Sequence, residues 1–544
     1  MTKVKPHQRK RAWAPKSRSG CPVIAIGTIR DFRADSTFVV RRVKCDETVP
    51  ICLKCSRGGF KCDGVSFGAG RAHHDGLVLI QNPLSSLALL SSGEDARAFD
   101  FFQANGISML SNGFGCDFWE RLVIQTAHAN PGIFRSIIAL STLLEDFTKW
   151  QMNWGAGLRA PMNEKTKLAL KHYGLALRQL SSHLQGSESM NVISLTSCLL
   201  FSCIEALIGN IAGSANLANV GLKMLCQAES ENIDIESHSP LRSFWSVFMQ
   251  ADSLFVQMQR IRAPEYQAPF ISRPFHTMPS SFSNLREATY YLNALVNMSK
   301  RLGSATEDPT ARPRNLEACR VLFVQWNSAF HQLVHHIKPA DESERRRLCL
   351  CHVWRLDTRL TLYGPQEGAP EVEWDKHEQS FSELLKHAST LSRLDSQTHD
   401  DNLTSFSLGG GIFFPIAGLG FRCRDPKMRR AAISLLFRHS HAEGPLLGPI
   451  AARFIQKVVA IEEHGLGQVL TSADVPESAR VNSFSAHLRG KGNGAEVSYS
   501  RLDPDTGARV TVYDAVLGAS GLRAGIEQCR VSPNDDVDAI VISI

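Results

Sequence analysis

The N-terminal part of this chain contains the stretch Arg41-Arg42-Val43-Lys44-Cys45-Asp46-Glu47-Thr48-Val49-Pro50-Ile51-Cys52-Leu53-Lys54-Cys55, which closes with Cys62-Asp63-Gly64. Its four cysteines follow the spacing C-x6-C-x2-C-x6-C. Thiolates at this density favour a soft tetrahedral metal, and zinc fits best. Lysine and arginine surround the cysteines, which indicates a polyanionic partner. The stretch therefore predicts a small metal-dependent module that binds a polyanion.

The basic character of the chain is concentrated in this N-terminal segment. The 544 residues carry a net charge of +7, whereas residues 1–64 hold 15 Lys and Arg against 5 Asp and Glu, a net of +10. The remainder is therefore near −3. Such an arm attracts phosphates, and the attraction weakens with salt. Residues 1–20 predict a basic disordered tail, in which His7-Gln8-Arg9-Lys10-Arg11 is either a nuclear-import signal or plain solvated charge.

The rest of the chain has a globular composition, with 43% hydrophobic residues and length for two or more domains. Nine further cysteines are scattered, and no signal peptide is evident, which predicts a reducing, intracellular compartment and inert buried thiols. The most apolar run, residues 192–208, contains Glu205 and predicts a buried helix. No membrane-spanning segment is expected.

The hydrophobic pattern divides the chain into five segments: a tail (1–20), the cysteine module (21–64), a linker (65–110), an all-α domain (111–470) and a C-terminal tail (471–544). Asn130-Pro131 predicts a helix start, and helical periodicity follows it. Alternating residues at 496–499 and 509–513 flank a turn sequence and predict a short β-hairpin. The fold class is thus mostly α, with a small N-terminal zinc-cluster module before a large all-α domain.

The cysteine-rich stretch resembles the second part of a fungal Zn2Cys6 binuclear cluster domain. In that family six cysteines hold two zinc ions, in the pattern C-x2-C-x6-C, a loop, then C-x2-C-x6-to-8-C. Ser17-Arg18-Ser19-Gly20-Cys21 is similar to the lead-in to the first cysteine of the family. The resemblance implies zinc as cofactor and the metal ligands Cys21, Cys45, Cys52, Cys55 and Cys62.

The first half of this cluster is interrupted by residues 22–40. Counted back from Cys45, the family pattern places cysteines where this chain has Phe38 and Asp35. We interpret residues 22–40 as a retained intron or a gene-model error; the alternative is a natural divergent cluster. An intact cluster holds two zinc ions, and one or none is expected for the chain as written. Two ligand sets remain open for that one zinc: Cys52, Cys55 and Cys62 completed by Cys21, or the same three completed by Cys45.

The same resemblance implies how the module would bind double-stranded DNA. In the family, a basic residue three positions before the third cysteine reads a guanine edge in the major groove. That position is Arg42 here, and arginine suits guanine O6 and N7. Arg41 and Lys44 would contact phosphate or sugar. The implied function is zinc-dependent, sequence-specific regulation of RNA polymerase II genes in the nucleus, through CGG-type half-sites.

The helical body is similar to the fungal-specific transcription factor middle region. The resemblance rests on the order of short motifs, among them Phe118-Trp119-Glu120-Arg121-Leu122-Val123, Leu199-Leu200-Phe201-Ser202-Cys203 and Arg422-Cys423-Arg424-Asp425-Pro426. It implies a regulatory domain, with a homodimer and transcription coregulators as further partners. Residues 65–100 show no sustained heptad, so dimerisation stays open.

Two other functions compete with this one. The chain has no P-loop or His-Glu-x-x-His motif, and we do not expect an enzyme. The serious alternative is a helical regulatory or partner-binding protein that does not bind DNA and carries a degenerate zinc cluster.

Overall fold

The computed structural model describes residues 93–111, 118–151, 163–185, 192–230, 239–259, 278–302, 310–366, 368–398, 406–438, 442–444, 446–488, 494–503, 506–517 and 541–543. The chain divides into two units, Met1–Asp75 and Gly76–Ile544. All described residues belong to the second unit. The predicted class, mostly α with a few strands near the C-terminus, is confirmed for them, whereas the N-terminal module lies outside them.

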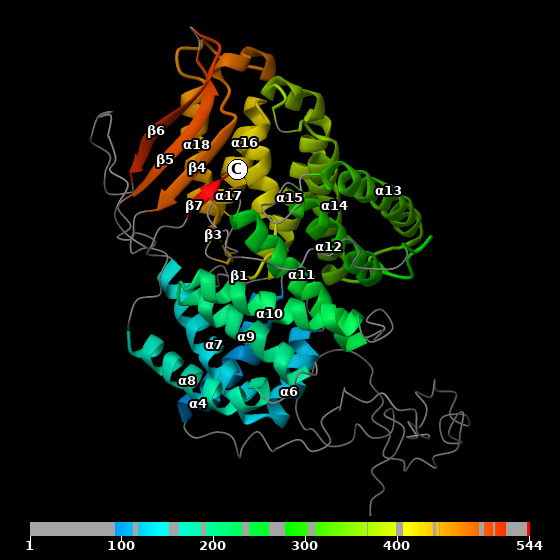
Figure 1. The fold of residues 1–544 in the computed structure, drawn as a ribbon, viewed down its shortest axis with the longest axis vertical. Coiled ribbons are helices and arrows are strands. Elements are labelled where there is room, and N and C mark those ends of the chain that lie inside the picture. The colour runs from blue at the N-terminus through cyan, green and yellow to red at the C-terminus, as the bar shows by residue number, and fades with distance from the viewer. Residues whose placement is uncertain are drawn as a thin grey trace, which may run out of the picture. The chain divides into compact units, whose positions relative to one another are not determined.

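The first half of the second unit is a succession of helices. They are α4 (Gly93–Phe101), η1 (Phe102–Gly106), α5 (Ile107–Leu110), η2 (Phe118–Val123), α6 (Ile124–Ala129), α7 (Pro131–Gln151), α8 (Glu164–Gln185), α9 (Val192–Leu207), α10 (Ile211–Ser230) and α11 (Ser239–Gln259). Helix α7 packs against α8 and α9, α9 packs against α10, and α10 packs against α11 (Figure 1). Neighbours in sequence are therefore neighbours in space.

The second half continues in the same way and then ends in a sheet. Its helices are α12 (Leu285–Arg301), α13 (Arg312–His336), α14 (Glu342–Tyr363), η4 (Glu371–His377), α15 (Glu378–Thr398), α16 (Phe413–Arg422), α17 (Pro426–Arg438), α18 (Gly448–Glu462), η5 (Ser472–Asp474) and η6 (Glu477–Ala479). Helix α12 packs against α11, α13 and α14, while α17 packs against α15, α16 and α18.

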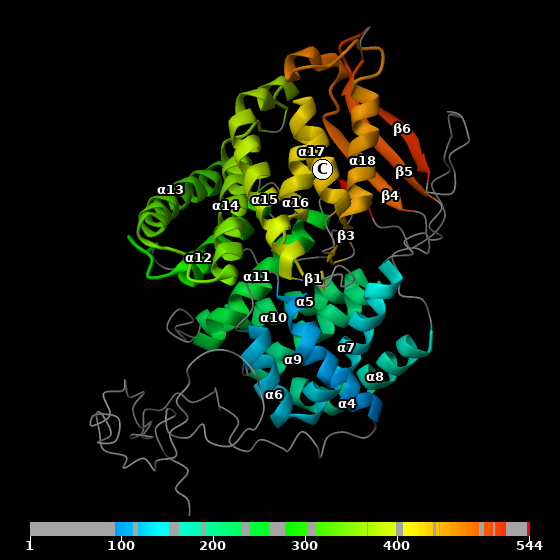
Figure 2. The ribbon, with the colours of Figure 1, turned by 180° about the vertical axis from the view of Figure 1, so that it is seen from behind.

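The strands form two sheets. The smaller has the order β1-β2-β3, from β1 (Phe406–Ser407), β2 (Ala442–Glu443) and β3 (Leu446–Leu447). The larger is antiparallel with the order β6-β5-β4-β7, from β4 (Ser483–Leu488), β5 (Gly494–Leu502), β6 (Arg509–Leu517) and β7 (Val541–Ser543). Strands β5 and β6 confirm the predicted hairpin. Figures 1 and 2 show β4, β5 and β6 alongside α18.

The boundaries of the helical body differ from those predicted. Residues 93–110 were expected in the linker, yet they form α4, η1 and α5, because Phe99 and Phe102 are buried in the core. Residues after 471 were expected to form a tail. Phe484 of β4 and Val497 of β5 instead join the same core, so the sheet is part of the body.

Polar side chains fix where several helices begin. The Oδ1 atom of Asn130 accepts the backbone N–H of Gly132 at 2.8 Å, and Pro131 is the first residue of α7, as the sequence predicts. Asp425 does the same before Pro426, the first residue of α17, by accepting the N–H of Met428 at 2.8 Å. The N–H groups of Gly132 and Met428, which have no partner within their own helices, therefore each have an acceptor.

Helix α9 is the most apolar of the predicted helices, and its burial is confirmed. All its residues except Val192, Ile193 and Glu205 are buried. Glu205 accepts a hydrogen bond from the hydroxyl of Tyr173 on α8, which satisfies the one carboxylate in the helix. In the part of the chain that the structure describes, no helix has the length and apolar character to cross a membrane.

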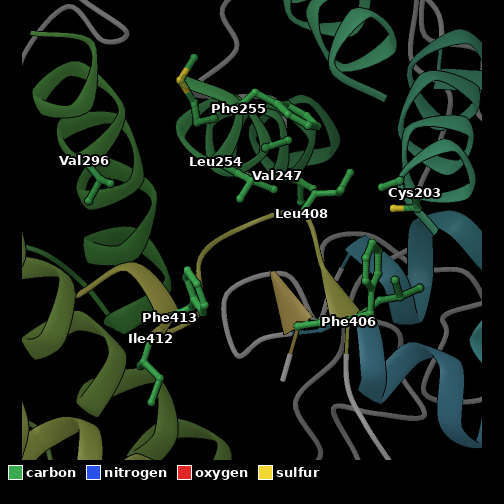
Figure 3. Packing of buried hydrophobic residues seen from close by; sticks show 14 of the residues in the cluster. Cys203, Val247, Leu254, Phe255, Val296, Phe406, Leu408, Ile412 and Phe413 are labelled. Carbon is green, nitrogen blue, oxygen red and sulfur yellow. The ribbon is translucent and has the colours of Figure 1, made fainter. Parts of the chain in front are cut away.

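Residues 406–413, called the joint segment below, lead into α16 and contact two helices of the first half, α7 and α11. Figure 3 shows Leu408 facing α11, while Phe406 packs on the side of α7. Gly409 has a φ of +96°, and a Cβ atom there would lie 2.6 Å from the carbonyl oxygen of Gln250. The close approach of the joint segment to α11 therefore requires glycine at this position.

Candidate functional site

The eight residues predicted to bind zinc or DNA lie outside the described residues. They are Cys21, Cys45, Cys52, Cys55 and Cys62, with Arg41, Arg42 and Lys44. Their roles therefore stay predictions. Among the described residues, no group of three or more His, Cys, Asp or Glu side chains is placed to hold a metal ion. The body, as far as it is described, offers no second metal centre.

The described cysteines of the body are free thiols, and five of them are buried: Cys198, Cys203, Cys319, Cys351 and Cys423. Burial raises the pKa of Cys198 to about 12 and that of Cys351 to about 11. The thiolate is the form that binds metals and attacks electrophiles, so these sulfur atoms are inert at neutral pH. This agrees with the prediction of buried core thiols.

Four buried charged residues, Glu371, Arg424, Arg429 and Glu462, form a cluster that is called the buried ion cluster below. The two Nη atoms of Arg424 reach Glu371 at 2.9 Å and Glu462 at 2.8 Å. The other carboxylate oxygen of Glu462 lies 2.6 Å from Nη1 of Arg429. Four separate elements, η4, the α16–α17 turn, α17 and α18, thus meet at one set of charges.

Backbone groups complete the buried ion cluster. Arg424 also donates to the carbonyl oxygen of Val481 at 2.9 Å, and Glu462 accepts the N–H of Val481 at 2.8 Å. Asn482 donates to Glu371 at 3.0 Å. Val481 and Asn482 lead directly into β4, so the cluster anchors the C-terminal sheet to the helices.

Electrostatics favour the charged forms of Glu462 and Arg424 in the buried ion cluster. Burial alone would raise the pKa of Glu462, but the guanidinium groups of Arg429 and Arg424 outweigh it and lower that pKa. Burial would likewise lower the pKa of Arg424, and Glu462 and Glu371 outweigh it. Every charge has an opposite partner, so the arrangement is an anchor between elements rather than a reactive centre.

A bidentate pair between Arg480 and Asp375 lies next to the buried ion cluster. Arg480 donates to both carboxylate oxygens of Asp375 at 2.7 Å, and to the carbonyl oxygens of Val475 and Ser472. Its side chain is fully buried, whereas that of Asp375 is 27% exposed. Bidentate geometry of this kind is rigid, so it fixes the chain before β4 against η4.

Glu443 in β2 is a buried carboxyl group with no arginine or lysine paired to it among the described residues. Its Oε1 atom accepts the N–H of Phe413, the first residue of α16, at 2.8 Å, and no group among the described residues forms a hydrogen bond with its Oε2 atom. Burial raises its pKa to about 7 against the backbone N–H groups of Phe413 and Gly411, which lower it. The carboxyl group therefore titrates near neutral pH beside the joint segment.

Two histidine rings stack between α14 and α15. The centroids of His352 and His387 are 4.3 Å apart with an interplanar angle of 9°, and the ring of Phe330 meets His352 edge-on. Burial, with His387 and Arg355 nearby, lowers the pKa of His352 to about 3. His387 and Arg355 both disfavour a positive charge on His352, so the stack is a neutral packing contact at physiological pH.

A groove on the surface of α17 and α18 is open to solvent. It measures about 520 Å³, lies between α17 and α18, and is lined by Arg430, Ile433, Ser434, Phe437, Arg438, Gln456 and Val459. Phe437 is 40% exposed within it. The groove therefore combines an apolar surface with two guanidinium groups.

Two named relatives show what the chain is similar to. It is 22% identical to the aspercryptin biosynthesis cluster-specific transcription regulator atnN of Emericella nidulans, over 87% of this chain and 94% of that protein. It is 26% identical to the transcription regulator lscL of Purpureocillium lilacinum, over 34% of this chain and 47% of that protein. No family profile matches the chain, and no solved structure matches it. The two relatives support a role as a fungal transcription regulator.

Several residues that organise the body escaped the sequence analysis. Arg424 lies in one of the motifs that resemble the middle region, but nothing in the sequence links it to Glu462 or to Glu371, which is 53 residues before it. Arg480 and Asp375 are 105 residues apart. Glu371, Asp375 and Arg424 stand among other charged residues, so no sequence signal distinguishes them or identifies a partner.

Proposed function

We propose that the chain is a zinc-dependent transcription regulator that reads double-stranded DNA with residues 21–64. One observation carries the proposal: four cysteines spaced C-x6-C-x2-C-x6-C lie inside a segment of net charge +10. Similarity to a named transcription regulator over 87% of the chain supports the regulatory part. Nuclear action follows from the same role.

The donor chemistry of the cysteine segment fits zinc. Tetrahedral closure needs four ligands, and two sets supply them, Cys52, Cys55 and Cys62 completed either by Cys21 or by Cys45. Bound zinc would supply a fixed fold for a segment too small to form a hydrophobic core. Zinc binding is thus the step on which DNA recognition depends.

Three basic residues before Cys45 would then face the duplex. Arg42 would read guanine through O6 and N7, and Arg41 and Lys44 would position the module on phosphates. The body would act as the regulatory domain, through coregulators or a second copy of the chain. No reaction is assigned to it.

Metal content tests the proposal before any DNA is added. Purified full-length chain, dialysed free of loose metal, should carry about one zinc per chain by elemental mass spectrometry. Cys55→Ser should lower that value, whereas Cys226→Ser, a partly buried thiol of α10, should not. A zinc-free wild-type chain, or equal zinc in both variants, would contradict the proposal.

A second function is favoured by the interruption of the cluster. Residues 22–40 contain no cysteine, and Phe38 and Asp35 occupy the positions where the family has ligands. A degenerate cluster would leave a helical regulator that acts through protein partners alone. A metal-free chain that still changes transcription of a reporter when tethered to it would establish this alternative.

A further inference from the structure

The outward face of α17 carries basic side chains and one large aromatic side chain. Its exposed positions include Lys427, Arg430, Ser434, Phe437 and Arg438, and the helix contains no acidic residue. The opposite face is core. This solvent-facing stripe is therefore cationic along its length, with one large aromatic side chain near its end.

The groove beside this stripe has an apolar base. Ile433 of α17 is 7% exposed and packs into the core, and Val459 of α18 also contacts it. Phe437 stands next to them with 40% of its surface in solvent. A large aromatic side chain left half in water beside other apolar atoms is typical of a site that a partner covers.

The two arginines of the groove differ in how they are paired. Arg430 lies 2.9 Å from Glu463 of the loop after α18, in an exposed ion pair. Arg438 donates to the carbonyl oxygen of Ser434 at 3.3 Å, and no ion pair to it occurs among the described residues. The guanidinium of Arg438 is thus the group available to an incoming carboxylate.

We propose that the α17–α18 groove docks an amphipathic helical segment of a partner protein that combines acidic side chains with an apolar anchor. The anchor packs on Phe437, Ile433 and Val459, and a carboxylate of the partner pairs with Arg438. Helix-in-groove binding with apolar contacts and flanking charges is a recurrent mode of recognition. Charge complementarity selects the acidic partner, because a basic helix would meet Arg438 and Lys427. The inference goes beyond the proposed DNA binding and does not depend on zinc.

Fluorescence anisotropy of the full-length chain tests this docking. The probe is a labelled synthetic helix of about 15 residues, with leucines every three or four positions and glutamates on both flanks. It should bind with a dissociation constant in the micromolar range. Phe437→Ser and Arg438→Glu should each raise that constant about tenfold. The matched control is Arg314→Glu, an exposed arginine of α13, which should leave it unchanged.

A charge exchange separates docking from loss of folding. A second peptide, with lysine in place of every glutamate, should bind Arg438→Glu more tightly than it binds the wild-type chain. The proposal is overturned if the acidic peptide does not bind, or if it binds wild type and both groove variants equally. It is also overturned if a 20-base-pair duplex occupies the groove instead, seen as DNA affinity that falls in Arg438→Glu without any peptide binding.

Discussion

Arg424, in the turn between α16 and α17, lies 2.8 Å from Glu462 at the end of α18, and neither side chain is exposed to solvent. The same carboxylate oxygen of Glu462 accepts the N–H of Val481. One ion pair therefore joins two helices and the segment that leads into β4. This relationship makes the C-terminal sheet a part of the helical body, although the sequence suggested a tail.

Removal of Arg424 should destabilise the body strongly. Arg424→Ala leaves Glu371 and Glu462 buried with too little compensating charge, which typically costs about 3–5 kcal/mol. Urea unfolding followed by far-ultraviolet circular dichroism measures the change in the free energy of unfolding.

The matched control for this prediction is Arg430→Ala. Arg430 also pairs with a glutamate, Glu463, but its side chain is 54% exposed, and exposed pairs contribute about 0–1 kcal/mol. Equal losses of stability in the two variants would show that the buried ion cluster has no special role.

Glu443 should make the body less stable as the pH rises. Burial raises its pKa to about 7 from 4.5, so the folded chain holds a proton that the unfolded chain has released. The stabilisation is complete below pH 4.5 and is lost as the pH rises through about 7, at most about 3 kcal/mol. Glu443→Gln should remove this dependence. Unfolding free energies of wild type and variant at pH 5 and pH 8 test it, and a constant difference between them would refute it.

His352 should make the body less stable as the pH falls, which is the opposite of the effect of Glu443. The pKa of His352 is lowered to about 3 from 6.5. As the pH falls, this histidine therefore takes up a proton at a higher pH in the unfolded chain than in the folded chain. The stabilisation is present above pH 6.5 and is lost as the pH falls toward 3, up to about 2 kcal/mol at pH 5. His352→Phe, which keeps a ring against His387, should therefore gain stability relative to wild type between pH 7 and pH 5. His336→Phe, at an exposed position of α13, serves as the control and should show no such gain.

Substitution by alanine should have opposite effects on stability at two helical glycines. A Cβ atom at Gly221 of α10 would lie 2.2 Å from the ring of Phe248 on α11, so Gly221→Ala should cost about 1–3 kcal/mol. Nothing lies within 4 Å of the same atom at Gly174 of α8, where alanine should add about 0.5–1 kcal/mol through its better helix propensity. Thermal melting of both variants gives the two signs, and a stabilised Gly221→Ala would mean that α10 and α11 pack less closely than described.

The sequence predicted local structure well where one pattern decides it. Asn130 with Pro131 marks the start of α7, the apolar run at 192–208 forms a buried helix, and the turn sequence after residue 502 joins β5 to β6. Each of these features depends on residues a few positions apart, so propensity and periodicity suffice.

Long-range structure could not be predicted in the same way. Strand β7 is three residues long and pairs with β4 from more than 50 positions away in sequence, at Ser543 opposite Ser485. The partners within the buried ion cluster are equally remote. The groove escaped notice because a stripe with Arg430 and Phe437 reads as an ordinary amphipathic helix face until α18 is placed beside it.

The candidate zinc and DNA residues remain predictions from spacing and charge. Cys45, Cys52, Cys55 and Cys62 lie outside the described residues, and the relatives support regulation of transcription without reference to zinc. The resemblance that identified them is independent of the fold of the body. A test must therefore address the N-terminal segment itself.

Binding of the zinc-loaded, full-length chain to a duplex with a CGG half-site, followed by anisotropy across a salt series, tests the central claim most directly. We predict an association constant whose logarithm falls linearly with the logarithm of the salt concentration. We also predict a preference for the CGG duplex over a scrambled duplex, which Arg42→Ala should reduce by about 1–3 kcal/mol. A zinc chelator should abolish the preference. Equal affinity for both duplexes in wild type and Arg42→Ala, or no binding to either, would contradict the claim.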